Sequence, residues 1–416
     1  MRVLCTTTGS PSHGRAQLPL LRALAAAGHE VRVLTTSDLV PLFRHDDFQV
    51  EPSLPDFSPG ALLGKDGDDD DAAPGSALAA LADLKPEEQR EALMPLMAKA
   101  LSGPLAKLMY EAIAPVAREY RPHLALRDGM DLGTVLIGEE LGIPHLPTPS
   151  GANNLLDPAT LLDGLNEVRA ELGLPIQDDP LSVVAHGRVD YVPAAFSFAR
   201  HMPAPLAYRQ TVEVERSSIL PDWFAELPTD RPLVWAAIGT ALPMIQKQRE
   251  EGKQEELPFE MPDPVKSLRI ILDAAAELTE CTVVVATSGL PVSDAGLPSH
   301  VRLTEWLPQP LVLETADLFL THGGFNSVRE ALRTATPMVV LPHFGDQFAN
   351  AERVAELGFG RGVTDFTPDA VAAACRAVLA DERAGQVARR ARLEMLTLPD
   401  VATAVTDLER LAGVTT

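Results

Sequence analysis

The sequence predicts an α/β protein of two domains, each built on a parallel β-sheet covered by helices. The chain has 416 residues, of which 46% are hydrophobic, so it has enough apolar material for two cores of ordinary size. Short apolar runs alternate with segments of helical composition through both halves of the chain. Such alternation is typical of parallel strands joined by crossover helices, where ligands lie at the carboxyl ends of the strands. We therefore expect two Rossmann-like, doubly wound domains that face each other across a cleft.

The first half opens with a strand, a Gly/Ser/Pro loop and an alanine- and leucine-rich helix that ends at Gly28. Proline, glycine and aspartate are frequent in 51–77, which predicts a long loop. The segment 86–120 is predicted to be helical, with breaks near three prolines, Pro95, Pro104 and Pro115. The expected elements of this half are strands at 2–5, 31–35 and 123–126 and helices at 17–27, 86–120 and 132–141.

The second half repeats this plan. A charged insert at 244–262 has few apolar residues and predicts a surface excursion directly after the first strand of this half. The expected elements are strands at 233–238, 282–287, 301–304, 317–320 and 338–341 and helices at 264–280, 327–334, 367–381 and 382–396. We divide the chain into an N-terminal domain at 1–205, a linker at 206–222, a C-terminal domain at 223–395 and a tail at 396–416 that is able to return to the N-terminal domain.

Charge and composition restrict the partners. With 58 acidic and 35 basic residues the formal charge is −23, and a field of that sign repels nucleic acid and anionic membranes. No run approaches the roughly 18 apolar residues of a membrane span, and the first apolar run is too short for a signal peptide. The three cysteines, Cys5, Cys281 and Cys375, are widely spaced and are expected to be buried thiols. We expect a cytoplasmic protein without membrane insertion.

The most informative stretch is 321–330, taken together with 345–347. An apolar strand precedes a two-glycine turn, which leads into a segment of helical composition. This order places exposed backbone N–H groups, His322 and two small polar side chains at a helix N-terminus, where a phosphate binds well. Glu330 follows His322 by about two helical turns and is able to reach a ribose. The pattern therefore predicts a nucleotide site.

Three linked motifs in the second half resemble the nucleotide-sugar motif of the family 1 glycosyltransferases, which have the two-domain GT-B fold. They are Trp306-Leu307-Pro308-Gln309, the block His322-Gly323-Gly324-Phe325-Asn326-Ser327 with Glu330, and Asp346-Gln347. The sequence of residues 344–351 is also similar to the corresponding sequence of bacterial antibiotic glycosyltransferases. The resemblance implies inverting transfer of a sugar from a nucleotide diphosphate, UDP or TDP, to a hydroxyl of a small hydrophobic natural-product acceptor, without a metal or cofactor.

The resemblance also implies a role for each donor-site position. The base is assigned to Trp306 with Gln309 nearby, and the ribose to Glu330. The diphosphate is assigned to His322, Gly324, Asn326 and Ser327, with Gly239 and Thr240 at its β-phosphate. The sugar is assigned to Asp346 and Gln347. The indole would stack on the base, and the imidazole and helix N-terminus would hold the diphosphate. From the residues alone, a core position for Trp306, a solvated helix face for Glu330 and a plain turn at Gly239 stay open.

The acceptor chemistry is expected in the first βα loop. His13 matches the family's general base, which takes the proton of the acceptor hydroxyl as that hydroxyl attacks the anomeric carbon. A place near a helix N-terminus favours a neutral imidazole, as a base requires. Asp128 would orient His13, and Asp131 is the competing carboxylate. Two positions depart from the family's pattern, Ser12 where glycine is usual and Ala16 where proline is common, so the loop is expected to differ in shape.

Other functions are weighed against sugar transfer. A nucleotide-sugar epimerase of the same fold would need no acceptor, and a non-catalytic auxiliary partner of a glycosyltransferase would need no intact donor site. A dehydrogenase is disfavoured because the first turn lacks GxGxxG and the second strand ends in Thr35-Thr36. Asp-x-Asp matches in 66–71 lie in a Gly/Pro-rich loop and are not expected to bind metal. The sequence does not determine the oligomeric state, and a homodimer is one of the states that it allows.

The acceptor pocket is expected in the loops of 51–120 and 148–165. Apolar side chains there would line a greasy surface for the acceptor, among them Phe57, Leu62, Met94, Met97 and Leu155. The base, the sugar, the acceptor and the type of glycosidic bond stay open at this point.

Overall fold

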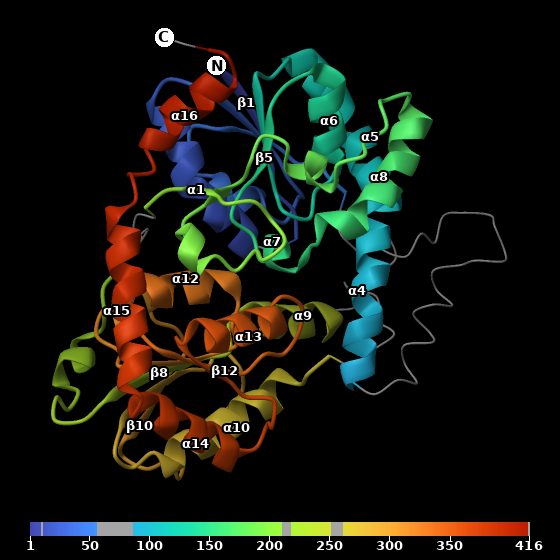
Figure 1. Cartoon of the computed structure of the whole chain (residues 1–416). Coiled ribbons are helices and arrows are strands. Elements are labelled where there is room, and N and C mark those ends of the chain that lie inside the picture. The colour runs from blue at the N-terminus through green and yellow to red at the C-terminus, as the bar shows by residue number, and fades with distance from the viewer. Residues whose placement is uncertain (10, 56–85, 210–217, 251–260, 415–416) are drawn as a thin grey trace. The chain divides into compact units, whose positions relative to one another are not determined.

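The structure is a computed structural model that describes residues 1–9, 11–55, 86–209, 218–250 and 261–414. The chain divides into two compact units (Figure 1). The described parts of Met1–Thr211 and Pro399–Thr416 form the N-terminal unit, and those of Val212–Gln254 and Met261–Leu398 form the C-terminal unit. Most of the loop predicted at 51–77, with Phe57, Leu62 and the aspartates of 66–71, lies outside the described residues.

Five parallel strands form the main sheet of the N-terminal unit, in the order β3-β2-β1-β4-β5. They are β1 (Arg2–Thr6), β2 (Glu30–Leu34), β3 (Gln49–Glu51), β4 (Leu124–Arg127) and β5 (His145–Pro147). Val3 of β1 lies opposite Val31 on one side and Leu124 on the other. The strand order thus reverses between β1 and β4, which is where ligands bind in doubly wound sheets. The predicted parallel sheet is confirmed, and β3 and β5 extend it.

The helices of the N-terminal unit are α1 (Pro11–Ala26), α4 (Pro86–Ser102), α5 (Pro104–Tyr120), α6 (Gly133–Leu141), α7 (Ala152–Leu155), α8 (Pro158–Leu172) and α16 (Thr403–Leu411). The 3-10 turns η1 (Val40–Phe43), η2 (Pro180–Val184) and η3 (Ala194–Phe196) and a small two-stranded sheet of β6 (Val189–Asp190) and β7 (Leu206–Ala207) complete it. Ala404, Val405 and Leu408 of α16 share a core with Leu20 and Leu24 of α1.

The predicted breaks near Pro95 and Pro115 are wrong, because α4 and α5 run through these prolines and the chain breaks only at Gly103, before Pro104. Packing explains the difference for α5. The helix buries a stripe at four-residue spacing, Leu105, Met109, Ile113 and Ala117. Burial of that stripe against the core compensates for the backbone hydrogen bond that an internal proline cannot donate.

Two other boundaries also differ from the prediction. Helix α1 begins at Pro11 rather than at 17, so His13 lies in its first turn and not in a loop before it. A proline suits the first helical turn because its φ is preset and its missing N–H is not needed there. Helix α8 occupies much of 148–165, where we predicted loops. Its N-cap, Asp157, accepts a hydrogen bond from the backbone N–H of Ala159 at 2.9 Å.

Six parallel strands form the sheet of the C-terminal unit, in the order β10-β9-β8-β11-β12-β13. They are β8 (Leu233–Ala237), β9 (Thr282–Ala286), β10 (Val301–Thr304), β11 (Leu318–Thr321), β12 (Met338–Val340) and β13 (Gly360–Gly362). Phe319 of β11 lies opposite Trp235 of β8 and Met338 of β12. This second sheet therefore reverses its order between β8 and β11, and it confirms the second parallel sheet that we predicted.

The helices of the C-terminal unit are α9 (Ala241–Glu250), α10 (Pro264–Glu277), α11 (Gln309–Val312), α12 (Phe325–Thr334), α13 (Gln347–Leu357), α14 (Pro368–Leu379) and α15 (Glu382–Thr397), after the 3-10 turn η4 (Asp222–Glu226). Helix α9 enters the charged insert at 244–262 and continues as far as Glu250; 251–260 lie outside the described residues, so the predicted surface excursion stays a prediction. Within the described ranges no helix has both the length and the apolar character to cross a bilayer.

Candidate active site

His13 and Asp128 meet where the strand order of the N-terminal sheet reverses. His13 lies in the first turn of α1, which follows β1, and Asp128 directly follows β4. Nδ1 of His13 and Oδ2 of Asp128 are 2.7 Å apart, and the side chains are 20% and 1% exposed. The backbone N–H of Met130 donates to the other carboxylate oxygen at 2.9 Å. A carboxylate held in this way favours the imidazole tautomer with its proton on Nδ1 and its lone pair on Nε2.

Asp131, the competing carboxylate, has different partners. It is fully buried and accepts hydrogen bonds from the hydroxyls of Thr6 and Thr134, both at 2.5 Å, and from the backbone N–H of Thr134 at 3.1 Å. Burial raises the pKa of Asp131, and the threonine hydrogen bonds oppose this rise. Asp131 thus joins β1 to the start of α6, whereas Asp128 contacts His13.

In the C-terminal unit, His322 lies in a narrow space between two glycines. It follows β11, and Gly239 follows β8, so both lie where the order of the second sheet reverses. A Cβ atom added to Gly239 would lie 2.6 Å from Nε2 of His322, and one added to Gly324 would lie 2.5 Å from the same atom. Gly239 also has a φ of +76°. Only glycine leaves the imidazole this room.

Helix α12 begins directly after this imidazole. Gly324 is its N-cap and supplies no side-chain hydrogen bond to the first turn. Asn326, in that turn, accepts a hydrogen bond from Nη2 of Arg329, a buried cation. The helix therefore combines N-terminal backbone N–H groups, a glycine N-cap and a nearby guanidinium, which is an arrangement that suits an anion.

Three predicted donor-site residues, Gln309 at the start of α11 and Ser327 and Glu330 in α12, form one hydrogen-bonded group. Nε2 of Gln309 donates to Glu330 at 2.7 Å and to the hydroxyl of Ser327 at 3.2 Å. Trp235, which the sequence analysis did not select, donates from Nε1 to Oε1 of Gln309 at 3.4 Å. The indole of Trp306 is 64% exposed, so this residue is not a core tryptophan. An exposed indole suits stacking on a base, and a carboxylate such as that of Glu330 suits the hydroxyls of a ribose.

The predicted sugar-binding pair lies at the start of α13. The carboxylate of Asp346 accepts from Nδ2 of Asn350 at 2.8 Å, and the same amide donates to the carbonyl of Gly323 at 2.9 Å. Oε1 of Gln347 accepts from the backbone N–H groups of His343 at 2.8 Å and Phe344 at 3.3 Å. Both of these contacts use the oxygen of the Gln347 amide and not its NH₂ group. Thr240, exposed at the start of α9, stands apart from these contacts.

Several residues that hold these groups in place were not predicted from the sequence. Buried Gln17 donates to the carbonyl of Thr6 and to the hydroxyl of Thr148, both at 3.0 Å, and so ties α1 to β1 and to the residue after β5. Asn350 links α13 to the glycine turn. Polar residues on otherwise apolar helix faces were the available signal for both. The sequence gives no local indication that Trp235 belongs to the site, because its partner Gln309 is distant in sequence. It gives none for His343 either, because His343 binds Gln347 through its backbone N–H.

The buried imidazole of His343 should make the stability of the folded protein depend on pH in the acid range. Its side chain is 6% exposed and neither ring nitrogen has a hydrogen-bond partner among the described residues. Burial lowers the pKa of His343 to about 4. Between about pH 6.5 and 4, this imidazole is therefore protonated in the unfolded chain but neutral in the folded protein. We expect the free energy of unfolding to fall as the pH drops from about 6.5 to 4, by up to roughly 3 kcal/mol from this residue.

Urea unfolding at a series of pH values measures this effect. His343→Phe should lose the part of the acid dependence that comes from this imidazole while keeping the ring contact with Phe366, which lies 5.6 Å away between centroids. Burial and the neighbouring His343 also lower the pKa of His322 to about 4, so the variant should retain some dependence. Identical slopes for wild type and variant between pH 6.5 and 4 would contradict this account.

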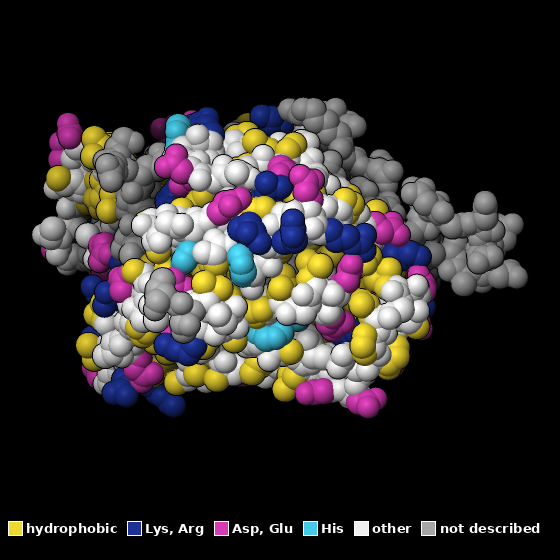
Figure 2. All heavy atoms as spheres, turned by 90° about the horizontal axis from the view of Figure 1, so that it is seen from above, with side chains coloured by type: hydrophobic (Ala, Val, Ile, Leu, Met, Phe, Trp, Pro, Cys, Tyr) yellow, Lys and Arg dark blue, Asp and Glu magenta, His cyan; other side chains and the backbone are white. Residues whose placement is uncertain are grey.

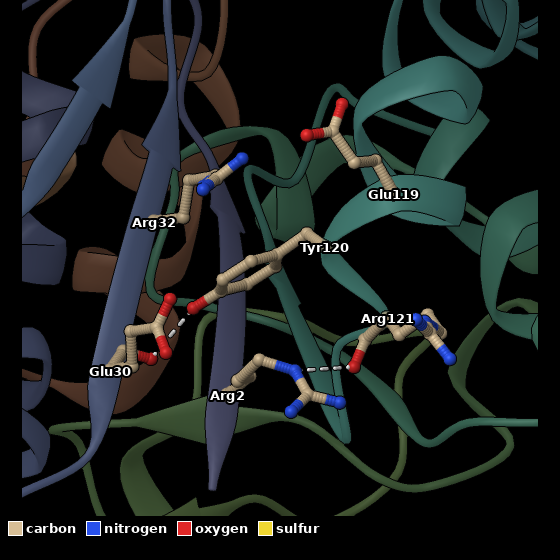
Figure 3. A pocket seen from close by; sticks show the side chains of 6 residues that line it. All are labelled: Arg2, Glu30, Arg32, Glu119, Tyr120 and Arg121. Atoms are coloured by element: carbon tan, nitrogen blue, oxygen red, sulfur yellow. Dashed lines mark hydrogen bonds between the residues drawn. The ribbon is translucent and has the colours of Figure 1, made fainter.

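A hollow of about 430 Å³ lies at the other end of the N-terminal sheet, where β1 and β2 begin. Figure 3 shows its lining residues, Arg2, Glu30, Arg32, Glu119, Tyr120 and Arg121. Tyr120 donates to the carbonyl of Glu30 at 2.9 Å, Arg2 donates to the carbonyl of Arg121 at 2.9 Å, and the guanidinium of Arg32 stacks 4.3 Å from the Tyr120 ring centre. These contacts join the end of α5 to the sheet, and the hollow contains none of the predicted site residues.

Charged groups of both signs lie side by side on the surface. Figure 2 shows a face on which Lys and Arg side chains form a short row with Asp and Glu side chains beside it. Within the described ranges, His, Cys, Asp and Glu side chains form no group of three or more that could hold a metal ion.

Known proteins match this chain over nearly its whole length. Residues 22–239 match the N-terminal domain, and residues 269–411 the C-terminal domain, of the family described as erythromycin biosynthesis protein CIII-like. Aclacinomycin-T 2-deoxy-L-fucose transferase of Streptomyces galilaeus is 25% identical over 99% of this chain and 96% of its own length. L-demethylnoviosyl transferase of Streptomyces niveus is 26% identical over 94% of this chain and 93% of its own.

Solved structures share the fold. The spinosyn rhamnosyltransferase SpnG superposes with a TM-score of 0.72 at 23% identity and covers 98% of this chain and 100% of its own. The glycosyltransferase VinC, solved in complex with DTDP, has a TM-score of 0.71 at 23% identity over 100% of both chains. The predicted fold class is confirmed.

Proposed function

This chain belongs to the erythromycin biosynthesis protein CIII-like family of glycosyltransferases, and from that membership we propose which sugar transfer it performs and with which residues. The proposed reaction is inverting, metal-independent transfer from a TDP- or UDP-sugar to a hydroxyl of a small hydrophobic natural product. The names of relatives support a natural-product acceptor: one is an aclacinomycin-T deoxyfucose transferase. The complex of VinC with DTDP supports a thymidine nucleotide.

The observation that carries the donor part of the proposal is the imidazole of His322 between Gly239 and Gly324 at the start of α12. In this proposal His322 and the backbone N–H groups of the first helical turn bind the diphosphate. They also stabilise the negative charge that develops on the departing nucleoside diphosphate, together with Asn326 and Ser327. Gly239 and Thr240 approach the β-phosphate.

The remaining donor contacts are assigned by their chemistry. Trp306 stacks on the base beside Gln309, and Glu330, next to Gln309, accepts hydrogen bonds from the ribose hydroxyls. Asp346 and Gln347 bind the sugar, one as acceptor through its carboxylate and one as donor through its amide. The contacts that hold Gln309 and Asp346 in place support this division of roles.

The acceptor part of the proposal rests on the contact between His13 and Asp128. Nε2 of His13 removes the proton of the acceptor hydroxyl as that oxygen bonds to the anomeric carbon, while the bond from this carbon to the diphosphate oxygen breaks. Attack from the face opposite the leaving group inverts the anomeric centre. The buried carboxylate of Asp128 stabilises the imidazolium that forms and keeps the ring in one orientation.

A thermal-shift comparison of TDP, UDP and GDP tests the donor site. A nucleotide at about 100 times its dissociation constant stabilises the folded protein by about 2.7 kcal/mol, which raises the melting temperature. We expect a rise with TDP or UDP, a smaller one or none with GDP, and no change of the response in EDTA. Loss of the response in EDTA would overturn metal independence. Conversion of a TDP- or UDP-sugar without any acceptor would indicate an epimerase instead.

A further inference from the structure

Arg127, the last residue of β4, is a buried cation next to Asp128. Its side chain is 1% exposed. Nη1 lies 3.2 Å from the carbonyl oxygens of Asp128 and Asp131 and 3.4 Å from that of Gly129, and Nη2 donates to the carbonyl of Val183 at 2.9 Å. The guanidinium thus bonds the backbone of the turn that carries Asp128 and anchors this turn to η2.

Burying this guanidinium costs desolvation free energy, which its contacts must offset. Nε of Arg127 has no hydrogen-bond partner among the described residues. Burial lowers the pKa of Arg127 to about 10, although Asp131 and Asp128 act in the opposite direction. An apolar side chain at the end of this buried strand would avoid the desolvation. What the arginine provides instead is a planar fork that binds several carbonyls of one turn at once.

The same turn is also confined from its other side. A Cβ atom added to Gly129 would lie 2.7 Å from Oδ1 of Asn153 and 3.0 Å from Oγ of Ser150. The backbone N–H of Asp128 donates to the carbonyl of Thr6 at 3.1 Å, which ties the turn to β1. The turn is therefore held by the arginine, by a neighbouring helix start and by the strand that leads to His13.

We propose that Arg127 is a positioning residue for the His13–Asp128 pair: its guanidinium fixes the turn of residues 128–131 so that the Asp128 carboxylate stays on Nδ1 of His13. The inference rests on the proposed role of His13 as the base. Arg127 lies in the N-terminal unit, and the hydrogen bonds of its guanidinium described above all go to carbonyls of that unit. Its loss should therefore affect the base and leave nucleotide binding unchanged.

Several titratable groups surround the guanidinium and enter any pH measurement. Asp128 and Asp131 face it from its own turn, and His145 faces it from β5, where Arg127 is among the causes that lower the pKa of His145. Cys5 of β1 senses both aspartates, and burial together with them raises its pKa well above the usual range. A substitution that keeps the positive charge is needed to separate the position of Asp128 from the charge of Arg127.

Arg127→Lys is that substitution, since an ammonium keeps the charge but cannot bridge the carbonyls as the planar fork does. The readout is the pH midpoint of the His13 ring, followed by NMR and assigned with His13→Gln. When Asp128 is less well placed, the imidazolium loses stabilisation, so the midpoint should fall by about one pH unit. In an Asp128→Asn background the lysine should add no further shift. This comparison needs no substrate.

Arg169→Lys is the matched control, because Arg169 is equally buried but bonds Glu139, Asn166 and Ser182. It should leave the His13 midpoint unchanged. Should Arg127→Lys not fold, Arg127→Gln is put through the same cycle with Asp128→Asn. Because loss of the positive charge by itself would raise the His13 midpoint, only a fall of the midpoint in Arg127→Gln supports the positioning role. An unchanged midpoint in the Arg127 variant, or an equal shift in both backgrounds, would overturn the proposal.

A kinetic measurement separates this inference from the proposed function. With a TDP- or UDP-sugar and a hydroxylated acceptor, Arg127→Lys should lower kcat about tenfold and leave the KM for the nucleotide sugar unchanged, as expected for a residue that acts through the base. If His13→Ala retains full transfer, the base assignment is wrong whatever Arg127 does. If His13→Ala is impaired and the His13 midpoint ignores Arg127, only the positioning role is wrong.

Discussion

Replacing His13 by alanine is expected to lower sugar transfer by about 10²–10⁴-fold, the usual contribution of a general base. The reason is the contact of its Nδ1 with the buried Asp128 carboxylate at 2.7 Å, which favours the tautomer with its lone pair on Nε2, the atom that we propose removes the acceptor proton. Without the imidazole, the acceptor hydroxyl keeps its proton during attack and remains a weak nucleophile. Release of the nucleoside diphosphate in the presence of aromatic and macrolide alcohols measures the rate.

Nucleotide binding is the control for this variant. His13 and the predicted donor residues lie in different units, so His13→Ala should bind TDP or UDP with wild-type affinity. Asp128→Asn should also lower transfer, because an amide cannot stabilise the imidazolium as a carboxylate does. The Thr6 and Thr134 hydrogen bonds of Asp131 stay intact in that variant. Undiminished transfer by His13→Ala would remove the base assignment.

Gly239→Ala is expected to weaken binding of TDP or UDP by about 10–100-fold, the effect of losing one charge-assisted hydrogen bond. The added methyl group would lie 2.4 Å from Cε1 and 2.6 Å from Nε2 of His322, so the imidazole must leave the place from which it would bind the diphosphate. The φ of +76° adds backbone strain of about 1–2 kcal/mol for any residue with a Cβ atom. Titration calorimetry with each nucleotide measures the affinity.

Gly28→Ala separates the strain from the clash. Gly28 follows α1 with a φ of +83°, and a Cβ atom added there would meet nothing within 4 Å. Both variants should therefore lose a similar free energy of unfolding from the backbone, while only Gly239→Ala loses nucleotide affinity. Wild-type affinity in Gly239→Ala would mean that His322 does not hold the diphosphate.

Local signals were sufficient for most of the fold. Each of the apolar runs of β1, β8 and β11, and the glycine turn before α12, is encoded by residues that are only a few positions apart, so periodicity and turn chemistry predict them. Proline signals were misleading inside α4 and α5, because burial of one helix face outweighed the local cost. The start of α1 was placed too late because glycine and proline beside His13 suggested a loop.

By itself, the sequence determined the two parallel sheets and the set of residues that follow their strands, because both are written in short-range patterns of apolar and turn-forming residues. The tertiary structure alone decided which carboxylate contacts His13, since His13 and Asp128 are 115 positions apart. It also decided that Gly239 leaves room for the ring of His322 and that Arg127 is buried against the turn of Asp128. Such contacts depend on strand order and packing, and no local pattern in the chain records them.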